Sequence, residues 1–267
     1  MAEAVRLYAV IALSRVRSQL QYRTSFVLDL IGMFLIAFLD FLAIAIIFQN
    51  VPRLGDWSLE EVALLYGMSG IAFAITDMVV GHLDELGLLI RSGDFDVMLV
   101  RPMSTLIQVL TLDFQLRRLG KLSQSAVVLA YAISALDIDW NAARVAVLAS
   151  TIVSAAVIFG AVWVAVICIV FWSVEGNETA NAFTYGGQFL AQYPLTIYDA
   201  WLRRLLAFVM PMAFVAYLPA LYILGKPNEL GLPRVLQFAS PVVAVLACVV
   251  ARLVWRFSVR HYRSAGG

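Results

Sequence analysis

The chain of 267 residues is too apolar for a soluble protein, because 62% of its residues are hydrophobic, 14% are charged and the mean hydropathy is +0.87. A soluble domain carries about 25% charged residues, so we expect an all-α polytopic membrane protein with a single transmembrane domain over residues 1–267. The formal net charge of +1 does not indicate a nucleic-acid partner. Cys168 and Cys248 lie in apolar runs, where they are expected to pack between helices rather than form a disulfide.

Residues 1–23 are predicted to form an amphipathic helix on the inner surface of the membrane. Arg6, Arg15, Arg17 and Arg23 interrupt this segment and fall largely on a different face from its apolar residues. We do not expect a cleavable signal peptide, because no small-residue cleavage site follows a short apolar core.

Six apolar segments approach the length of about 20 residues that a membrane-spanning helix needs. They cover residues 25–48, 62–80, 122–136, 145–172, 175–193 and 236–254, and a more polar connector, 81–121, separates the second from the third. The stretch 197–235 is apolar, but Pro211 and Pro219 interrupt it, and Arg203 and Arg204 stand side by side in it. We therefore expect this stretch to form a re-entrant element, two helices that dip into the outer leaflet and return.

The distribution of Lys and Arg predicts the orientation of the spans. With the N-terminus in the cytoplasm, thirteen of the 19 basic residues fall on the cytoplasmic side and six on the other. This excess predicts that both termini are cytoplasmic and that the number of spans is even, and six fits the apolar segments best.

No motif indicates that the chain is an enzyme. The phosphate-binding sequence Gly-x-x-x-x-Gly-Lys-Ser/Thr is absent, and so are nucleophile-elbow and zinc motifs. His82 and His261 are far apart in the sequence, so no metal site is expected. A lipid-modifying enzyme is the nearest catalytic alternative, but the sequence offers no active-site residues for it.

The segment from Leu89 to Pro102 combines charged and apolar residues between two long apolar runs. Its charges could not lie unpaired in hydrocarbon, so water must bathe the segment, and its apolar residues then need a surface to contact. We predict a cytoplasmic coupling helix that docks on a partner, whereas a merely solvated loop is the alternative. The residues expected to make the contact are Arg91, Asp94, Phe95, Asp96, Met98, Leu99 and Arg101.

Polar residues inside the predicted spans are candidates for a substrate path, because such residues are costly in lipid and are expected to face a bundle interior, a partner subunit or a watery cavity. For the aspartates among them, a structural role as an ion-pair partner or helix cap is an equal alternative. The candidates are Asp29, Asp40 and Asp77 in the first two spans, and Asn181, Gln188 and Gln192 in the fifth.

In its order of segments and in two stretches of sequence, the chain resembles the membrane subunit of type 2 ABC exporters. The first stretch is similar to the connector that these permeases dock on their ATPase; it reads Arg91-Ser92-Gly93-Asp94-Phe95-Asp96 and continues through Leu99-Val100-Arg101-Pro102. The second is similar to the fifth span and outer re-entrant helices of the family; it comprises Tyr193-Pro194-Leu195, then Trp201-Leu202-Arg203-Arg204 and Pro211.

This resemblance implies the partners and the location. The chain would form half of a translocation path in a bacterial or archaeal cell (inner) membrane, together with a second permease chain, identical or different. Separate ABC ATPase subunits would bind ATP and magnesium, so no cofactor is expected in this chain. An ion- or proton-coupled secondary transporter is the alternative, but it would show inverted repeats and broken helices in both halves, and the sequence shows one break.

Overall fold

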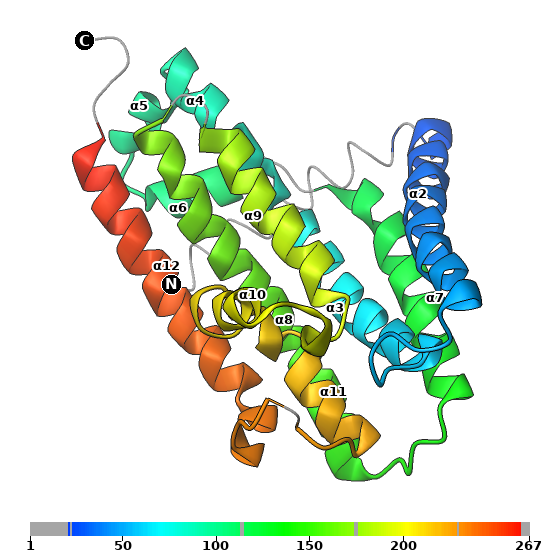
Figure 1. The fold of residues 1–267 in the computed structure, drawn as a ribbon. Coiled ribbons are helices and arrows are strands. Elements are labelled where there is room, and N and C mark those ends of the chain that lie inside the picture. Colours follow the sequence, from blue (N-terminus) through cyan, green and yellow to red (C-terminus); the bar gives the residue numbers. More distant parts are fainter. Residues whose placement is uncertain (1–20, 22, 113–114, 174–175, 229, 263–267) are drawn as a thin grey trace.

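The computed structural model describes residues 21, 23–112, 115–173, 176–228 and 230–262, and over these residues it is a bundle of helices without a named β-strand (Figure 1). The expected all-α fold is confirmed, while the predicted surface helix of residues 1–23 lies almost entirely outside the described residues. The long helices are α2 (Arg23–Asn50), α3 (Leu59–Val80), α7 (Leu119–Ala135), α8 (Ala142–Ile167), α9 (Gly176–Ala191) and α12 (Ser240–His261). The shorter elements are η1 (Gly81–Glu85), α4 (Leu86–Ser92), α5 (Asp94–Leu99), α6 (Thr105–Leu110), η2 (Leu116–Arg118), η3 (Cys168–Phe171), η4 (Leu195–Ile197), α10 (Ala200–Arg204), the π-helix η5 (Leu205–Val209), η6 (Met212–Phe214), α11 (Tyr217–Leu224) and η7 (Arg234–Phe238).

Each of the six predicted spans overlaps one of the long helices, but not all of these helices are long enough to cross a membrane. Within the described residues, four helical stretches have the necessary length and apolarity, and a bent pair of shorter helices would add a fifth if it formed one span. α7 has 17 residues and α9 has 16, fewer than the roughly 20 that a crossing needs. The chain is thus a multi-pass membrane protein with four or five candidate spans, and the count of six stays a prediction.

Side-chain caps fix where two of the helices begin. At the start of α3, Ser58 Oγ accepts a hydrogen bond from the Glu61 backbone N–H at 3.4 Å, and the Glu61 carboxylate accepts one from the Ser58 N–H at 2.9 Å. At the start of α8, Asn141 Oδ1 accepts from the Arg144 N–H at 2.9 Å. These bonds satisfy N–H groups that lack a partner within the helix, so the local sequence sets both boundaries.

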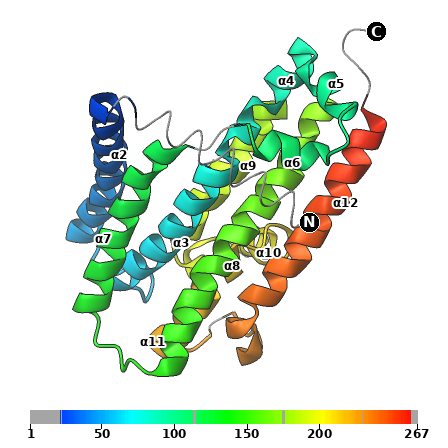
Figure 2. The same cartoon turned by 180° about the vertical axis from the view of Figure 1, so that it is seen from behind.

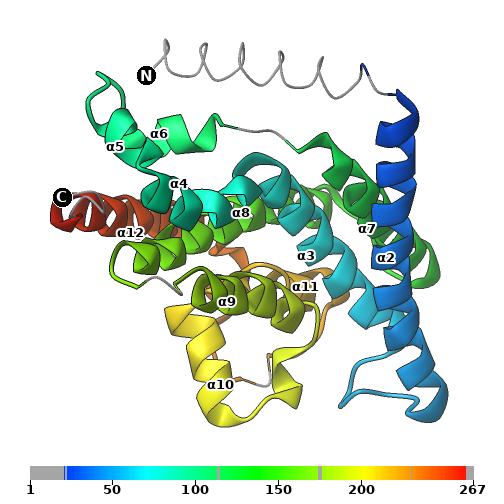
Figure 3. The same ribbon diagram turned by 90° about the horizontal axis from the view of Figure 1, so that it is seen from above.

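α3 is the central helix and packs against both α7 and α8 (Figure 2). The most apolar section of α3 is 78% buried inside the chain, whereas that of α2 is only 11% buried. Glycines bring α7 close to α3, since a Cβ on Gly67 would lie 2.7 Å from Leu129 Cβ and one on Gly70 would overlap Ser125 Oγ. Seen from above, α2 and α12 lie at opposite edges of the bundle (Figure 3).

The two ends of the bundle carry different segments. The start of α2, the connector helices α4 and α5, and the end of α12 lie at one end (Figure 1). At the other end, Lys226 Nζ donates to the Glu61 carboxylate and to the Asp56 carbonyl, both at 2.7 Å, and lies 4.5 Å from the centre of the Trp57 ring. These contacts tie the loop after α11 to the loop between α2 and α3.

Residues 200–224 form the bent pair, two helical stretches that meet at 76° where Met210 and Pro211 interrupt them. Pro211 has no backbone N–H to continue the hydrogen bonding of the preceding helix. Figure 1 shows α10 at mid-height of the bundle and α11 running from this region toward the α2–α3 loop. The predicted helix, break and helix are present, and this geometry fits either a broken span or a re-entrant element.

Candidate coupling segment and transport path

The part of the connector predicted to dock folds as two short helices, α4 and α5, which meet at Gly93. Gly93 has φ +80° in the left-handed region, which a glycine adopts without strain, and it ends α4 and begins α5. Of the charged residues predicted to make the docking contact, Arg91, Asp94 and Arg101 are exposed and Asp96 is half-buried. The connector therefore presents charges of both signs at its surface.

The inner face of α5 differs from the sequence prediction. Phe95 is fully buried and Met98 is 5% exposed, so the expectation that these two side chains form an exposed docking surface is wrong. They lie three positions apart, which places them on one face of the helix, and this face packs on the bundle. Leu99, also predicted to dock, is 40% exposed.

An aromatic cluster of Phe95, Phe171, Trp255 and Tyr262 holds this inner face. The Phe95 ring lies edge-on to those of Phe171 and Tyr262, with centroids 5.3 Å and 5.2 Å away. The Phe171 ring in turn is 5.7 Å from Trp255. Edge-to-face pairs contribute about 0.5–1.5 kcal/mol each beyond the burial of their area. Because Phe171 lies in η3 and Tyr262 follows α12, the cluster joins α5 to the ends of α8 and α12.

The outer face of α5 carries two apolar residues that the predicted contact set omitted. Val97 is 51% exposed and Val100, just after the helix, is 82% exposed. Val97 and Val100 are three positions apart and therefore share a face of the helix, as do Phe95 and Met98. Because the two pairs are offset by two positions, they lie on different faces. The sequence contains this spacing, but it does not tell which of the two faces is turned to the bundle. Together with Leu99, we name these valines the apolar ridge.

α6, a later part of the same connector, holds the end of α5 in place. Gln108 Nε2 donates to the carbonyls of Met98 and Met103, at 2.9 Å and 3.1 Å, so one buried amide holds both ends of the chain between α5 and α6. Thr105 Oγ1 accepts from Trp255 Nε1 at 3.2 Å. α6 is thereby bonded both to the connector and to α12.

Of the aspartates predicted for the path, Asp77 forms a buried ion pair. Arg118 Nε lies 3.1 Å from Asp77 Oδ2, and the two side chains are 19% and 0% exposed. This Arg118 nitrogen donates its hydrogen bond to Gln115 Oε1, at 3.2 Å, so its contact with Asp77 is an ion pair without a hydrogen bond. The pairing of Asp77 with an arginine favours the structural alternative that the sequence left open for this residue. It joins α3 to η2, at the end of the connector.

Asp84 forms a second polar junction, which the sequence analysis did not single out. Its carboxylate accepts from Trp163 Nε1 at 3.0 Å and from the Tyr185 hydroxyl at 3.1 Å. Asn177 Nδ2 donates to the Asp84 carbonyl at 2.6 Å. Asp84 thus connects η1 with α8 and α9. Its only sequence signal was a carboxylate directly after an apolar run, and its three partners follow it by about 80 to 100 positions.

The remaining path candidates do not form one site. Asp29 and Asp40 are exposed on α2. Gln188 on α9 is 7% exposed and Gln192, just after that helix, is 6% exposed, while Asn181 on α9 is half-buried. The polar row of α9 therefore faces the interior, as predicted for a helix that lipid would not tolerate.

α2 and α9 face each other across a cavity of about 280 Å³ near their ends away from the connector. Its walls are almost entirely apolar, with Ile44 and Ile47 from α2 and Phe189 from α9 among them. Because most of α2 is left uncovered by the chain, this side of the molecule is open to a further subunit or to lipid.

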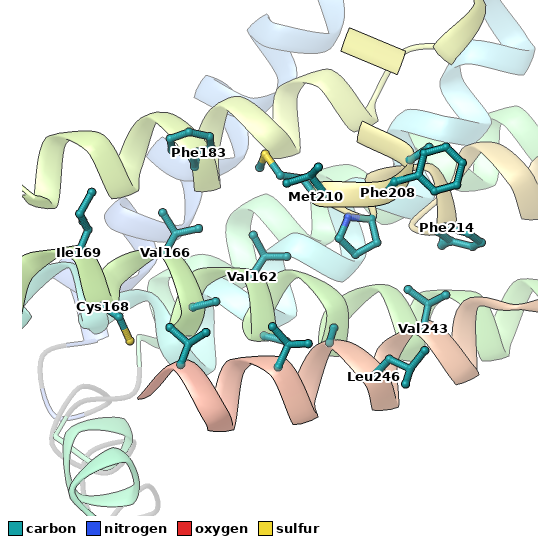
Figure 4. Close-up of a pocket in the computed structure, with 18 of the residues that line it drawn as sticks. Val162, Val166, Cys168, Ile169, Phe183, Phe208, Met210, Phe214, Val243 and Leu246 are labelled. Carbon is teal, nitrogen blue, oxygen red and sulfur yellow. The ribbon is translucent and has the colours of Figure 1, made fainter. Parts of the chain in front are cut away.

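A larger apolar cavity, of about 690 Å³, lies between α8, α12 and the π-helix η5 (Figure 4). Val162 and Val166 of α8, Leu246 of α12 and Phe183 of α9 point into it. Among the described residues, no charged side chain lines this cavity, so its lining offers no ion pair to a charged ligand.

These features define a polytopic helical membrane protein with a connector at one end that carries exposed charged residues. The sequence model of a family described as "ABC-2 family transporter protein" matches residues 34–266, and the chain belongs to this family, whose members are membrane components of transporters. The resemblance drawn from the sequence is confirmed at the level of the family. Neither a search of curated proteins nor one of solved structures gave a match.

Proposed function

We propose that the chain is the membrane subunit of an ATP-driven exporter and that α4 and α5 couple it to a separate ATPase subunit. The observation that carries this proposal is the two-faced geometry of α5. Its inner face is anchored through Phe95 to the ends of α8 and α12, while Val97 and Val100 face outward. A force applied to the apolar ridge would pass through the aromatic cluster to two long helices.

In this proposal the ATPase subunits hold ATP and magnesium, and this chain hydrolyses nothing. Two ATPases need two connectors, so a second permease chain completes the assembly. The path would run between the two chains along α2 and α9, where Asp40 is exposed and Gln188 and Gln192 line the interior. The sparse burial of α2 supports a partner on that side.

The proposed orientation places both termini and the connector in the cytoplasm, with α9 ending and α12 beginning near the outer face. The bent pair between them would then be re-entrant. Single cysteines at Arg91 and Lys226, in a chain without Cys168 and Cys248, test this with a membrane-impermeant reagent. We expect labelling of the two positions from opposite faces, and labelling from one face would refute the orientation.

The coupling proposal is tested by introducing charged residues into the apolar ridge. Val97→Asp with Val100→Asp should leave the chain inserted, because both side chains are exposed. Burying a valine side chain is worth about 1.5 kcal/mol, so losing two such contacts would weaken docking by roughly 100-fold. Val235→Asp in η7, where Val235 is 70% exposed, is the matched control.

The measurements are co-purification of the ATPase subunit and ATP hydrolysis by the reconstituted complex. We expect both to fall in the double variant and to persist in the control, and we expect the isolated chain to hydrolyse no ATP. Normal co-purification and transport by the double variant would sink the coupling role of the ridge. Transport driven by a proton gradient without any ATPase would instead establish the secondary-transporter alternative.

A further inference from the structure

A cavity of about 800 Å³ lies between α3, α8 and α12, separate from the cavity of Figure 4 in most of its lining. Its walls are apolar along most of their length, with Val79, Val157 and Val164 among the lining residues. α6 lies across its connector end, beside α12 (Figure 2). At this end the lining changes from apolar to basic, with Arg252 and Arg256 of α12.

These two arginines lie on one face of α12. They are four positions apart, which places them about one helical turn, roughly 5–6 Å, from each other. Both are exposed, and among the described residues neither has an ion-pair partner. Two cations this close repel each other, and an anion between them would remove the repulsion.

The arginines lie toward the end of α12 that would approach the headgroup region of a bilayer. At 1.5 Å per residue, Arg252 and Arg256 lie about 18 Å and 24 Å along the helix from Ser240, and Arg256 is the nearer to the end of a hydrocarbon layer of about 30 Å. Long basic side chains at this depth reach to the interface. In the proposed orientation, on which this step rests, that interface belongs to the cytoplasmic leaflet.

Lipid has access to this side of the molecule. Only 22% of the most apolar section of α12 is buried by the chain, and α2 and α9, which carry the proposed path, are not among the elements that line the cavity. A volume of 800 Å³ is within the range of about 300–1,000 Å³ typical of ligand sites. The site thus has a charged end at headgroup level and an apolar length that extends into the hydrocarbon, the shape of one phospholipid.

We propose that this cavity holds one anionic phospholipid of the cytoplasmic leaflet, with its phosphate between Arg252 and Arg256 and an acyl chain along α8. Basic pockets between membrane helices on the cytoplasmic side bind anionic headgroups in this way. The bound lipid would brace α12 against α6, next to the Thr105–Trp255 hydrogen bond. Anionic lipid would therefore steady the connector without entering the transport path.

The test measures binding of phosphatidylglycerol and phosphatidylcholine to the purified full-length chain by native mass spectrometry. We expect one phosphatidylglycerol to bind in preference to phosphatidylcholine, and Arg252→Gln with Arg256→Gln to weaken it about 10- to 30-fold. Arg203→Gln with Arg204→Gln removes the same charge outside the cavity and should leave binding unchanged.

A second pair of variants fills the apolar part and leaves the arginines in place. Gly160 lines the cavity and a Cβ on it would meet Thr76 at an ordinary 3.7 Å, so the longer side chain of Gly160→Leu is expected to extend into the cavity. Val157→Phe is the alternative if the first variant unfolds. Either variant should weaken phosphatidylglycerol binding at least as much as it weakens binding of inorganic phosphate.

Equal phosphatidylglycerol binding by the wild type and the arginine double variant would overturn the proposal. So would full competition by inorganic phosphate, which marks a soluble-anion site, or loss of the ATPase with lipid binding intact, which marks a protein contact.

Discussion

Replacing Phe95 with alanine should detach α5 from the bundle while the membrane helices stay folded. The side chain is fully buried and touches the rings of Phe171 and Tyr262. Large-to-small changes of this kind cost about 3–5 kcal/mol. A helix of six residues has little stability of its own, so this cost falls on the attachment of α5 rather than on the whole fold.

The attachment can be followed by hydrogen exchange of the backbone amides of residues 94–101. A loss of about 3–5 kcal/mol corresponds to exchange faster by roughly two to four orders of magnitude. Phe95→Leu keeps most of the apolar volume and should accelerate exchange far less. Val97→Ala, on the exposed face of the same helix, should have almost no effect.

Two outcomes would contradict the reasoning. If exchange in residues 94–101 is the same in Phe95→Ala as in the native chain, the aromatic cluster does not hold α5. If instead the whole bundle loses protection to the same extent, α5 is an integral part of the core and cannot move separately. In the expected case, co-purification of the ATPase and substrate-stimulated ATP hydrolysis by the complex both fall, because the apolar ridge is no longer held in place.

Asp77→Asn should lower the free energy of unfolding of the detergent-solubilised chain, measured by thermal denaturation, by about 3–5 kcal/mol, because it leaves Arg118 without its buried counter-charge. Asp29→Asn, at an exposed position, should leave the free energy of unfolding unchanged. Equal effects of the two substitutions would argue against a structural ion pair. Gly67→Ala should cost about 1–3 kcal/mol in the same assay, since its Cβ would meet the backbone of α7 at 2.8 Å. Gly32→Ala, with nothing within 4 Å of its Cβ, is the control, and a stable Gly67 variant would show that α7 can shift away.

The positions of the long helices could be predicted because each needs a run of about 20 apolar residues, and such runs are visible in one sequence. Their lengths were harder to predict. The predicted third span, 122–136, nearly coincides with α7, Leu119–Ala135, but the 17 residues of α7 are too few to be counted as a span by length and apolarity. Apolar composition identifies what is shielded from water, but not whether lipid or protein provides the shield.

The contacts of individual polar and aromatic side chains were beyond the sequence, because their partners come from distant segments. Asp77 could be recognised as unusual within a span, yet nothing near it in sequence pointed to Arg118. Phe95 was assigned to the surface because its neighbours are charged, but its ring is covered by Phe171 and Tyr262. Helical spacing divides α5 into two apolar faces, and only the folded bundle decides between them.

The covering of Phe95 by Tyr262 sets an order of events during biosynthesis. Translation produces the connector early, but Tyr262 appears only after α12, the last of the described helices, has been made. Until then α5 lacks one wall of its aromatic cluster, and a short helix without its tertiary contacts is marginal. The surface that the ATPase is proposed to recognise is therefore complete only once translation has passed Tyr262, so that a chain interrupted before α12 has little chance of binding the ATPase.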